Sequence, residues 1–168
     1  GTLRPGDTVK VLPSGKQSVV ERIVTFDGDL AQAQAGQAIT VTLQDEIDIS
    51  RGDLLVAPDA PTAVSKRLLA HLVWMAESPL STGRLYDIKL ATKKTPGQFS
   101  AIRHRTDVNS LEQHDASELK LNGIGLVELV LTNAVGADPY TQVRDTGSFI
   151  VIDRLSNVTI GAGMVVEA

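Results

Sequence analysis

The feature that most constrains the fold of this 168-residue chain is a series of short apolar runs, each ended by turn residues. In residues 39–44 (ITVTLQ), apolar and polar side chains alternate strictly. A period of two places one row of side chains on a core and the other in solvent, which is typical of a β-strand. Asp27-Gly28 and the segment 49–53 (ISRGD) supply turns on either side of this run. The pattern predicts antiparallel strands joined by turns.

Strand-like runs separated by turn signals continue along the whole chain, at the spacing of a small barrel or sandwich. Strands are predicted at residues 8–12, 17–24, 39–44, 54–56, 67–75, 84–91, 99–105, 123–131, 147–153 and 158–166. The run 67–75 (RLLAHLVWM) is also compatible with a helical turn, but the turn residues that follow it favour a strand. The other segments are predicted as a basic turn at 93–98, a polar loop with some helical character at 111–119 and a loop at 132–145.

The segment Ala57–Pro61 (APDAP) is the best candidate for a linker. Proline fixes the backbone angle φ, so two prolines with small neighbours make a short and stiff connection. We therefore expect two domains, residues 1–60 and residues 61–168, both built from strands. The glycines of the last strand (residues 158–166) are expected to mark a bulge or a tight corner of a barrel.

Composition excludes several classes of function. Sixteen Lys and Arg residues stand against twenty Asp and Glu, a net charge of −4, which argues against nucleic acid as the main partner. The chain has no cysteine, which excludes disulfides, thiolate zinc sites and thiol catalysis and is consistent with a cytoplasmic location. No apolar run approaches the roughly 20 residues of a membrane helix, so no membrane partner is expected.

Two acidic groups resemble metal sites in composition. Asp45, Glu46 and Asp48 cluster as a metal or acid–base site would, but no histidine or further carboxylate accompanies them, which favours an exposed hairpin end. Asp27 and Asp29 flank a glycine without the spacing of a calcium-binding loop, and a turn is the simpler interpretation. We expect no metal site here.

A basic segment, Arg103-His104-Arg105, is a candidate surface for an acidic partner or a phosphate, together with Lys93-Lys94. The alternative is a strand edge protected by charge. The chain's three histidines are too scattered in sequence to form a metal motif.

Two tripeptides match known sequence motifs but are not interpreted as functional. Arg51-Gly52-Asp53 spells a cell-adhesion tripeptide and is interpreted as a turn. Residues 157–159 (NVT) match a glycosylation acceptor, which is discounted at the start of a strand in a cytoplasmic protein.

Several blocks resemble translational GTPases of the elongation-factor Tu type. Residues 3–9 (LRPGDTV), 35–39 (AGQAI) and 49–55 (ISRGDLL) resemble the second domain of that family, and residues 153–163 (DRLSNVTIGAG) resemble the last strands of its third domain. The resemblance implies an all-β chain of two consecutive antiparallel β-barrels, like domains 2 and 3 of elongation factor Tu, with the first barrel lacking its opening strand.

A narrower resemblance covers nearly the whole chain. Five blocks are similar to the large, GTPase subunit of bacterial sulfate adenylyltransferase: residues 22–30, 45–53, 73–80, 121–127 and 152–159. The resemblance implies a parent complex that makes adenylyl sulfate and pyrophosphate from ATP and sulfate, coupled to GTP hydrolysis. Its partner would be the catalytic subunit.

The chain departs from this family in its nucleotide motifs. The phosphate loop G-x-x-x-x-G-K-[ST] is absent, since Gly15-Lys16-Gln17 lacks both the upstream glycine and the hydroxyl residue that would hold magnesium. The guanine-reading Asn-Lys-x-Asp motif is also absent. We therefore interpret the chain as a fragment without the G domain, which would bind the GTP and magnesium. The fragment itself is expected to hold no cofactor and to catalyse no reaction.

The favoured hypothesis is a non-catalytic coupling module between the G domain and the catalytic subunit. Its candidate contacts are Arg103, Arg105, Asp45, Glu46, Asp48 and Arg51. An open edge of the first barrel is expected to self-associate. The alternative from another class is an RNA- or ribosome-contacting barrel module, which the acidic balance and the few aromatic residues disfavour. A stand-alone enzyme has the least support, because no nucleophile or metal constellation appears in the sequence.

Overall fold

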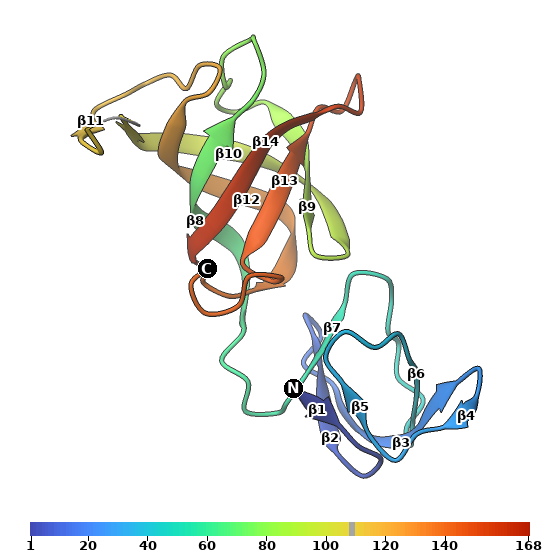
Figure 1. Cartoon of the computed structure of the whole chain (residues 1–168). Helices are drawn as coiled ribbons and strands as arrows, with labels where there is room; N and C mark the ends of the chain where they lie inside the picture. The colour runs from blue at the N-terminus through green and yellow to red at the C-terminus, as the bar shows by residue number, and fades with distance from the viewer. Residues whose placement is uncertain (108–109) are drawn as a thin grey trace. The chain divides into compact units, whose positions relative to one another are not determined.

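The computed structural model describes residues 1–107 and 110–168, and these residues form strands and loops with no helix. The all-β prediction is confirmed. The chain divides into two compact units, Gly1–Ala60 and Pro61–Ala168, and the boundary along the chain falls in the proline-containing segment (Figure 1). None of the described residues forms a helix that could cross a membrane.

The first unit contains seven short strands. They are β1 (Thr2–Leu3), β2 (Thr8–Leu12), β3 (Gln17–Thr25), β4 (Gly28–Asp29), β5 (Ala33–Gln34), β6 (Thr40–Leu43) and β7 (Leu54–Val56). One sheet runs in the order β4-β3-β2-β7, with β6 also paired to β3, and β1 pairs with β5. The predicted strands at 8–12, 17–24 and 54–56 are therefore present at almost their predicted bounds.

The core of the first unit is small and aliphatic. Val9, Val20, Ile23 and Ala33 are buried together, and the alternating apolar row of the β6 segment packs against them. The long strand β3 organises this unit, because its first half pairs with β2 and its second half pairs with β4 and β6. The register of β3 with β6 shifts between Val20 and Arg22, close to the point where the pairing of β3 changes from β2 to β6.

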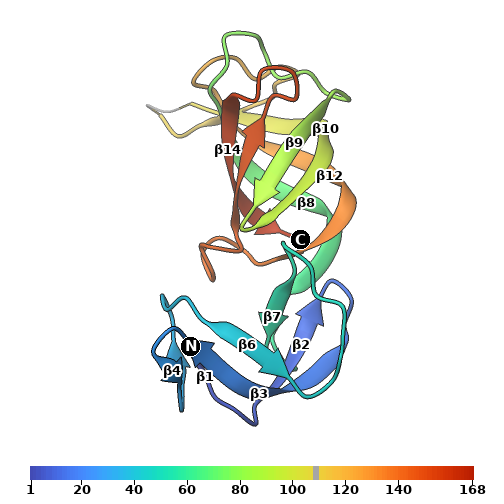
Figure 2. The same ribbon diagram turned by 90° about the vertical axis from the view of Figure 1, so that its right-hand side faces the viewer.

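The second unit is a closed antiparallel barrel. Its strands are β8 (Ala63–Trp74), β9 (Leu85–Leu90), β10 (Lys93–Thr106), β11 (Gln113–His114), β12 (Ile124–Ala137), β13 (Ser148–Ile152) and β14 (Thr159–Glu167). Six of them pair in the order β10-β12-β8-β14-β13-β9, and β9 pairs again with β10, which closes the ring. The short strand β11 lies outside the ring on β10. Figure 2 shows this barrel from the side.

The barrel core follows from strict alternation along the strands. In β8, Leu68, Ala70, Leu72 and Trp74 are buried while the residues between them face outward. This period of two confirms the strand prediction for residues 67–75 over the helical alternative. Trp74 and Tyr86 meet edge to face with ring centroids 5.7 Å apart, and Tyr86 also contacts Phe99. With Phe149, which is also buried there, the barrel core contains four of the six aromatic residues of the chain.

The predicted turn at 93–98 is wrong, because these residues begin the long strand β10. Pro96 has a register partner on β9 only, since the pairing of β10 with β12 starts at Gly97. A proline has no N–H to donate, and it is tolerated where a strand lacks a neighbour on one side. Gly97 is required for close packing, because a Cβ there would lie 2.9 Å from side chains of Ile88 and Leu131.

Two further loop predictions are partly wrong. Strand β12 continues to Ala137 through the segment predicted as a loop, with an irregularity between Val130 and Val135 that the sequence pattern does not reveal. The segment 111–119 contains the short strand β11 and, among its described residues, no helical turn.

Candidate partner-binding site

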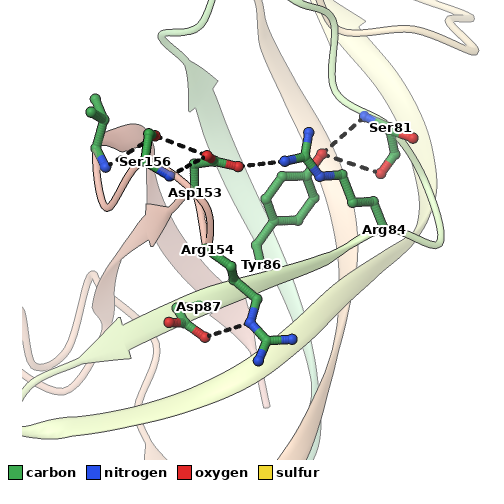
Figure 3. A network of polar contacts seen from close by, with 8 residues as sticks. Ser81, Arg84, Tyr86, Asp87, Asp153, Arg154 and Ser156 are labelled. Carbon is green, nitrogen blue, oxygen red and sulfur yellow. Dashed lines mark hydrogen bonds and ion pairs between the residues drawn. The ribbon is translucent and has the colours of Figure 1, made fainter.

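The clearest concentration of polar contacts in the second unit lies at the turn between β13 and β14 (Figure 3). Asp153 accepts hydrogen bonds from the backbone N–H of Ser156 at 2.9 Å and from its hydroxyl at 2.8 Å. The backbone N–H of Asp153 donates to the carbonyl of Val158, and that of Asn157 donates to the carbonyl of Asp153. Asn157 adopts φ of 60°, a left-handed conformation that asparagine tolerates. The turn is thus closed by its own side chains.

Two arginine–aspartate pairs join this turn to strand β9. Arg84, just before β9, pairs with Asp153, and Arg154 in the turn pairs with Asp87 on β9 at 3.3 Å between Nε and Oδ1. Lys94 also reaches Asp87, at 2.9 Å. One arginine therefore reaches from the start of β9 to the turn, and the other reaches from the turn back to β9 (Figure 3).

An aromatic side chain supports this polar cluster from the core. Tyr86 is buried, and the guanidinium carbon of Arg84 lies 5.3 Å from its ring centroid. The Tyr86 hydroxyl accepts from the backbone N–H of Ser81 at 3.2 Å and lies 3.4 Å from the Ser81 carbonyl. A cation placed over an aromatic face is electrostatically favourable, so Arg84 is held on two sides.

The electrostatics of the turn favour an ionised Asp153. The backbone and hydroxyl hydrogen bonds from Ser156 lower the pKa of Asp153 below its ordinary value, and the charge of Arg84 adds to this shift. Hydrogen bonds donated to a carboxylate stabilise its charged form. The cluster is therefore a fixed arrangement of charges at neutral pH.

Beside the cluster lies a groove of about 380 Å³, which Trp74, Met75, Pro79, Arg84 and Ile160 help to line. At the tip of the turn, the side chain of Leu155 is 90% exposed. An exposed apolar tip, a groove and fixed charges together can bind another protein. Across residues 1–107 and 110–168, no group of three or more His, Cys, Asp or Glu side chains could hold a metal ion.

The structure separates the basic residues that the sequence suggested as one surface. Arg103 pairs with Glu128 across β10 and β12, and both line a second groove of about 670 Å³. Arg105 is exposed and faces His114 of β11 in the register. Lys94 lies on the same strand, nine residues before Arg103, or about 30 Å along it. The two basic pairs therefore do not form one cluster.

The acidic turn lies in the first unit and is partly structural. The hydroxyl of Ser18, which is buried, donates to Asp45 at 2.8 Å and accepts from its backbone N–H at 3.1 Å. Glu46 and Asp48 are exposed. Arg51 precedes Gly52, which has φ of +97°, and the segment forms the predicted turn.

The residues of the polar cluster were not singled out from the sequence. Alternation along β9 placed Asp87 on the face opposite to Tyr86, but nothing in the sequence paired it with Arg154, 67 positions later. The only available signal was the block around Asp153, which resembles the last strands of the elongation-factor third domain. Spacing alone does not reveal contacts between strands that are adjacent only in the closed ring.

Comparison with known proteins gives consistent results. The chain is 73% identical over 168 residues to "Sulfate adenylyltransferase subunit 1" of Tolumonas auensis, and 66% identical over 167 residues to the protein of that name in Aeromonas hydrophila. It spans 36% and 35% of the length of these relatives. The resemblance to this large subunit is confirmed.

Solved structures and a family model agree on the fold. The structure described as sup35 complexed with GDP superposes with a TM-score of 0.89 at 17% identity, covering 99% of this chain and 41% of that one. The predicted elongation-factor-like fold is confirmed. The model of the family described as "GTP-eEF1A C-terminal domain-like" matches residues 67–166, which include most of the closed barrel and the polar cluster. The chain belongs to the GTP-eEF1A C-terminal domain-like family.

Proposed function

We propose that this chain is the two-barrel part of the GTPase subunit of a cytoplasmic sulfate adenylyltransferase, where it couples the G domain to the catalytic subunit without catalysing a reaction itself. The observation that carries the proposal is the 73% identity to "Sulfate adenylyltransferase subunit 1", which extends over the whole chain. In the parent complex, GTP hydrolysis would drive formation of adenylyl sulfate and pyrophosphate from ATP and sulfate.

The segment of this chain that is nearest in sequence to a phosphate loop does not fit a guanine nucleotide. Lys16, in the segment nearest to a phosphate loop, lies in the turn between β2 and β3 and is followed by a strand. A phosphate loop needs a glycine-rich turn that leads into the N-terminus of a helix, where backbone N–H groups meet the phosphates. We therefore assign GTP and magnesium to a G domain outside this chain.

The polar cluster explains how a movement at the β13–β14 turn would be passed to the whole closed barrel. Two arginine–aspartate pairs, Arg84–Asp153 and Arg154–Asp87, lock the β13–β14 turn to β9. A partner that pushes on this turn would move the barrel as one body instead of bending the turn. Rigid-body movement is what a coupling module between two other proteins or domains requires.

The test is a pull-down of the chain on the cognate catalytic subunit, with and without the separately purified G domain. Binding in either condition supports the proposal, and binding that needs the G domain makes the barrels a relay. We expect charge reversal at Arg154 to weaken binding if the β13–β14 turn is the contact. The matched test of the basic groove is Arg103→Glu together with Arg105→Glu. The acidic turn is tested with Glu46→Lys, Asp48→Lys and Arg51→Glu, and Asp45→Asn probes the carboxylate that Ser18 holds.

Two partner assignments need separate measurements. A band shift with tRNA at physiological salt tests the alternative of an RNA-contacting module, and clear specific binding would overturn the proposal. Strand β7 pairs only with β2 among the described strands, so we also propose that this edge can pair with another copy. Sedimentation at rising concentration tests this, and a monomer at all concentrations would contradict it.

A further inference from the structure

Phe26 is the most exposed aromatic side chain among the six of this chain, all of which lie in the described residues. It is fully exposed, at 105% of the reference area, whereas Phe99 and Phe149 are buried. Burying a phenylalanine stabilises a protein by roughly 1.5–3 kcal/mol relative to leaving it in water. Phe26 therefore adds nothing to the core of its own unit, and its whole ring is available for contact with another molecule.

The hairpin that carries Phe26 is held rigid on both sides. Arg22 on β3 and Asp29 on β4 form a two-pronged ion pair, with 2.7 Å from Nε to Oδ2 and 2.8 Å from Nη2 to Oδ1. The hydroxyl of Thr25 donates to the carbonyl of Gly28 at 2.9 Å, and Gly28 has φ of +118°, which a turn between these strands requires. Figure 1 shows the β3–β4 hairpin projecting from the rest of its unit. The aromatic ring is thus presented on a preorganised support.

The unit that carries this hairpin is acidic. Residues 1–60 contain nine Asp and Glu against five Lys and Arg, so they hold the whole net charge of −4, while residues 61–168 contain eleven of each. Asp27 is exposed directly beside Phe26. A surface of this sign attracts a basic partner and repels nucleic acid and other acidic surfaces.

We propose that Phe26 is the anchor of a protein-docking surface on the first unit, which inserts into an apolar pocket with a basic rim on the catalytic subunit. The identity of that partner rests on the proposed function. The chemistry of the pocket follows from the ring, from Asp27 beside it and from the net negative charge of the unit, since Asp29 is paired with Arg22. Rigid, exposed aromatic side chains are typical binding hot spots, because little conformational freedom is lost when they bind.

The test measures binding of the chain to the purified cognate catalytic subunit, without and with the separate G domain, by surface-immobilised kinetics. We expect Phe26→Ala to raise the Kd by about 30-fold, in the range of a hot-spot residue. Phe26→Trp should keep most of the affinity. Leu121→Ala is the matched control, since Leu121 is also an exposed apolar residue in a turn and should leave Kd unchanged.

The charge of the rim is tested by Asp27→Asn. We expect a slower association rate at low salt, and the difference from the wild type should disappear at high salt. If the wild type binds and Phe26→Ala binds equally well, the docking surface is overturned while the proposed function stands. If the wild type does not bind the catalytic subunit in any condition, the proposed function fails as well. Loss of self-association alone in Phe26→Ala would also overturn the proposal.

Discussion

Gly163 on β14 and Phe149 on β13 are register partners, and the phenylalanine ring lies directly on the glycine. A Cβ added to Gly163 would be 2.1 Å from Cζ of the ring, far inside van der Waals contact. The sequence suggested that glycines in this strand mark a bulge or a tight corner of a barrel, and a register irregularity does lie beside Gly161. At Gly163 the reason is instead the close approach of an aromatic ring across the sheet.

Replacing Gly163 with alanine is therefore expected to destabilise the closed barrel. The added methyl group would force the Phe149 ring out of its buried position, at a cost of about 1–3 kcal/mol in the free energy of unfolding. Chemical denaturation followed by Trp74 fluorescence measures this, since Trp74 is buried in the same barrel.

The double variant Gly163→Ala with Phe149→Leu provides the control. A smaller side chain at Phe149 leaves room for the methyl group, so the two substitutions should cost less together than the sum of their separate effects. Strict additivity would show that the contact between these two residues does not limit packing.

Asp153→Asn is expected to loosen the β13–β14 turn. The pKa of Asp153 in the folded protein is lowered, so the ionised carboxylate stabilises the fold above its ordinary pKa, and this contribution disappears as the pH falls through the lowered value. At neutral pH the variant should therefore have a lower Tm than the wild type, and in acid the two should converge. Calorimetry across a pH series checks this.

The same titration can be followed directly. The amide of Ser156 donates to Asp153, so its NMR chemical shift should follow the ionisation of the carboxyl group at a pH below the ordinary range for aspartate. A titration midpoint at or above that range would contradict the proposed hydrogen-bonded carboxylate.

Ala91→Asn is expected to stabilise the barrel. Ala91 lies in the two-residue turn between β9 and β10 and adopts φ of 47°, a left-handed conformation that costs a residue with a Cβ about 1–2 kcal/mol. Asparagine tolerates this conformation better, so we expect a gain of about 0.5–1 kcal/mol from relieved strain. Ala91→Val is the opposite control, because a β-branched residue should be worse there than alanine.

Thr95→Val is expected to cost about 1 kcal/mol despite its nearly unchanged shape. The hydroxyl of Thr95 is buried and lies 3.2 Å from the backbone N–H of Asn133 and 3.3 Å from its side-chain nitrogen, within the irregular stretch of β12. Valine removes the acceptor and leaves those donors without it. Thr95→Ser retains the hydroxyl and should lose less, as measured by urea unfolding; a loss in Thr95→Ser as large as in Thr95→Val would contradict a dominant role for the hydroxyl.

Most strands could be predicted because burial imposes a period of two on their residues. Tyr86 and Ile88 alternate with outward-facing residues in β9, as predicted, whereas the apolar run of β8 was predicted as a strand from the turn residues that follow it. The rule failed at residues 93–98, where Pro96 and Gly97 are usual signs of a turn. The closed ring explains why these two residues occur within a strand. Pro96 has no strand partner on one side, and Gly97 has no space for a side chain.

The candidate site was less predictable than the fold. Local patterns identified exposed charges such as Glu46 and Arg105, but a sequence does not state which carboxylate faces which cation across a barrel. Asp87 and Arg154 meet because β9 and β13 are neighbours in the ring, a relationship fixed by the whole fold and not by any local segment. The resemblance to the elongation-factor family drew attention to the block around Asp153 but did not indicate which residues this block contacts.

The closure of β9 onto β10 has a consequence for how this barrel can evolve. Each of the six ring strands has a hydrogen-bonded neighbour on both sides over part of its length, so the ring leaves only short stretches of backbone edge, such as the one that β11 occupies on β10. A partner of the ring is therefore recognised mainly by side chains and loop tips. Those can be exchanged one at a time without shifting the alignment of any strand, so the choice of partner can change across generations while the scaffold that presents it stays the same.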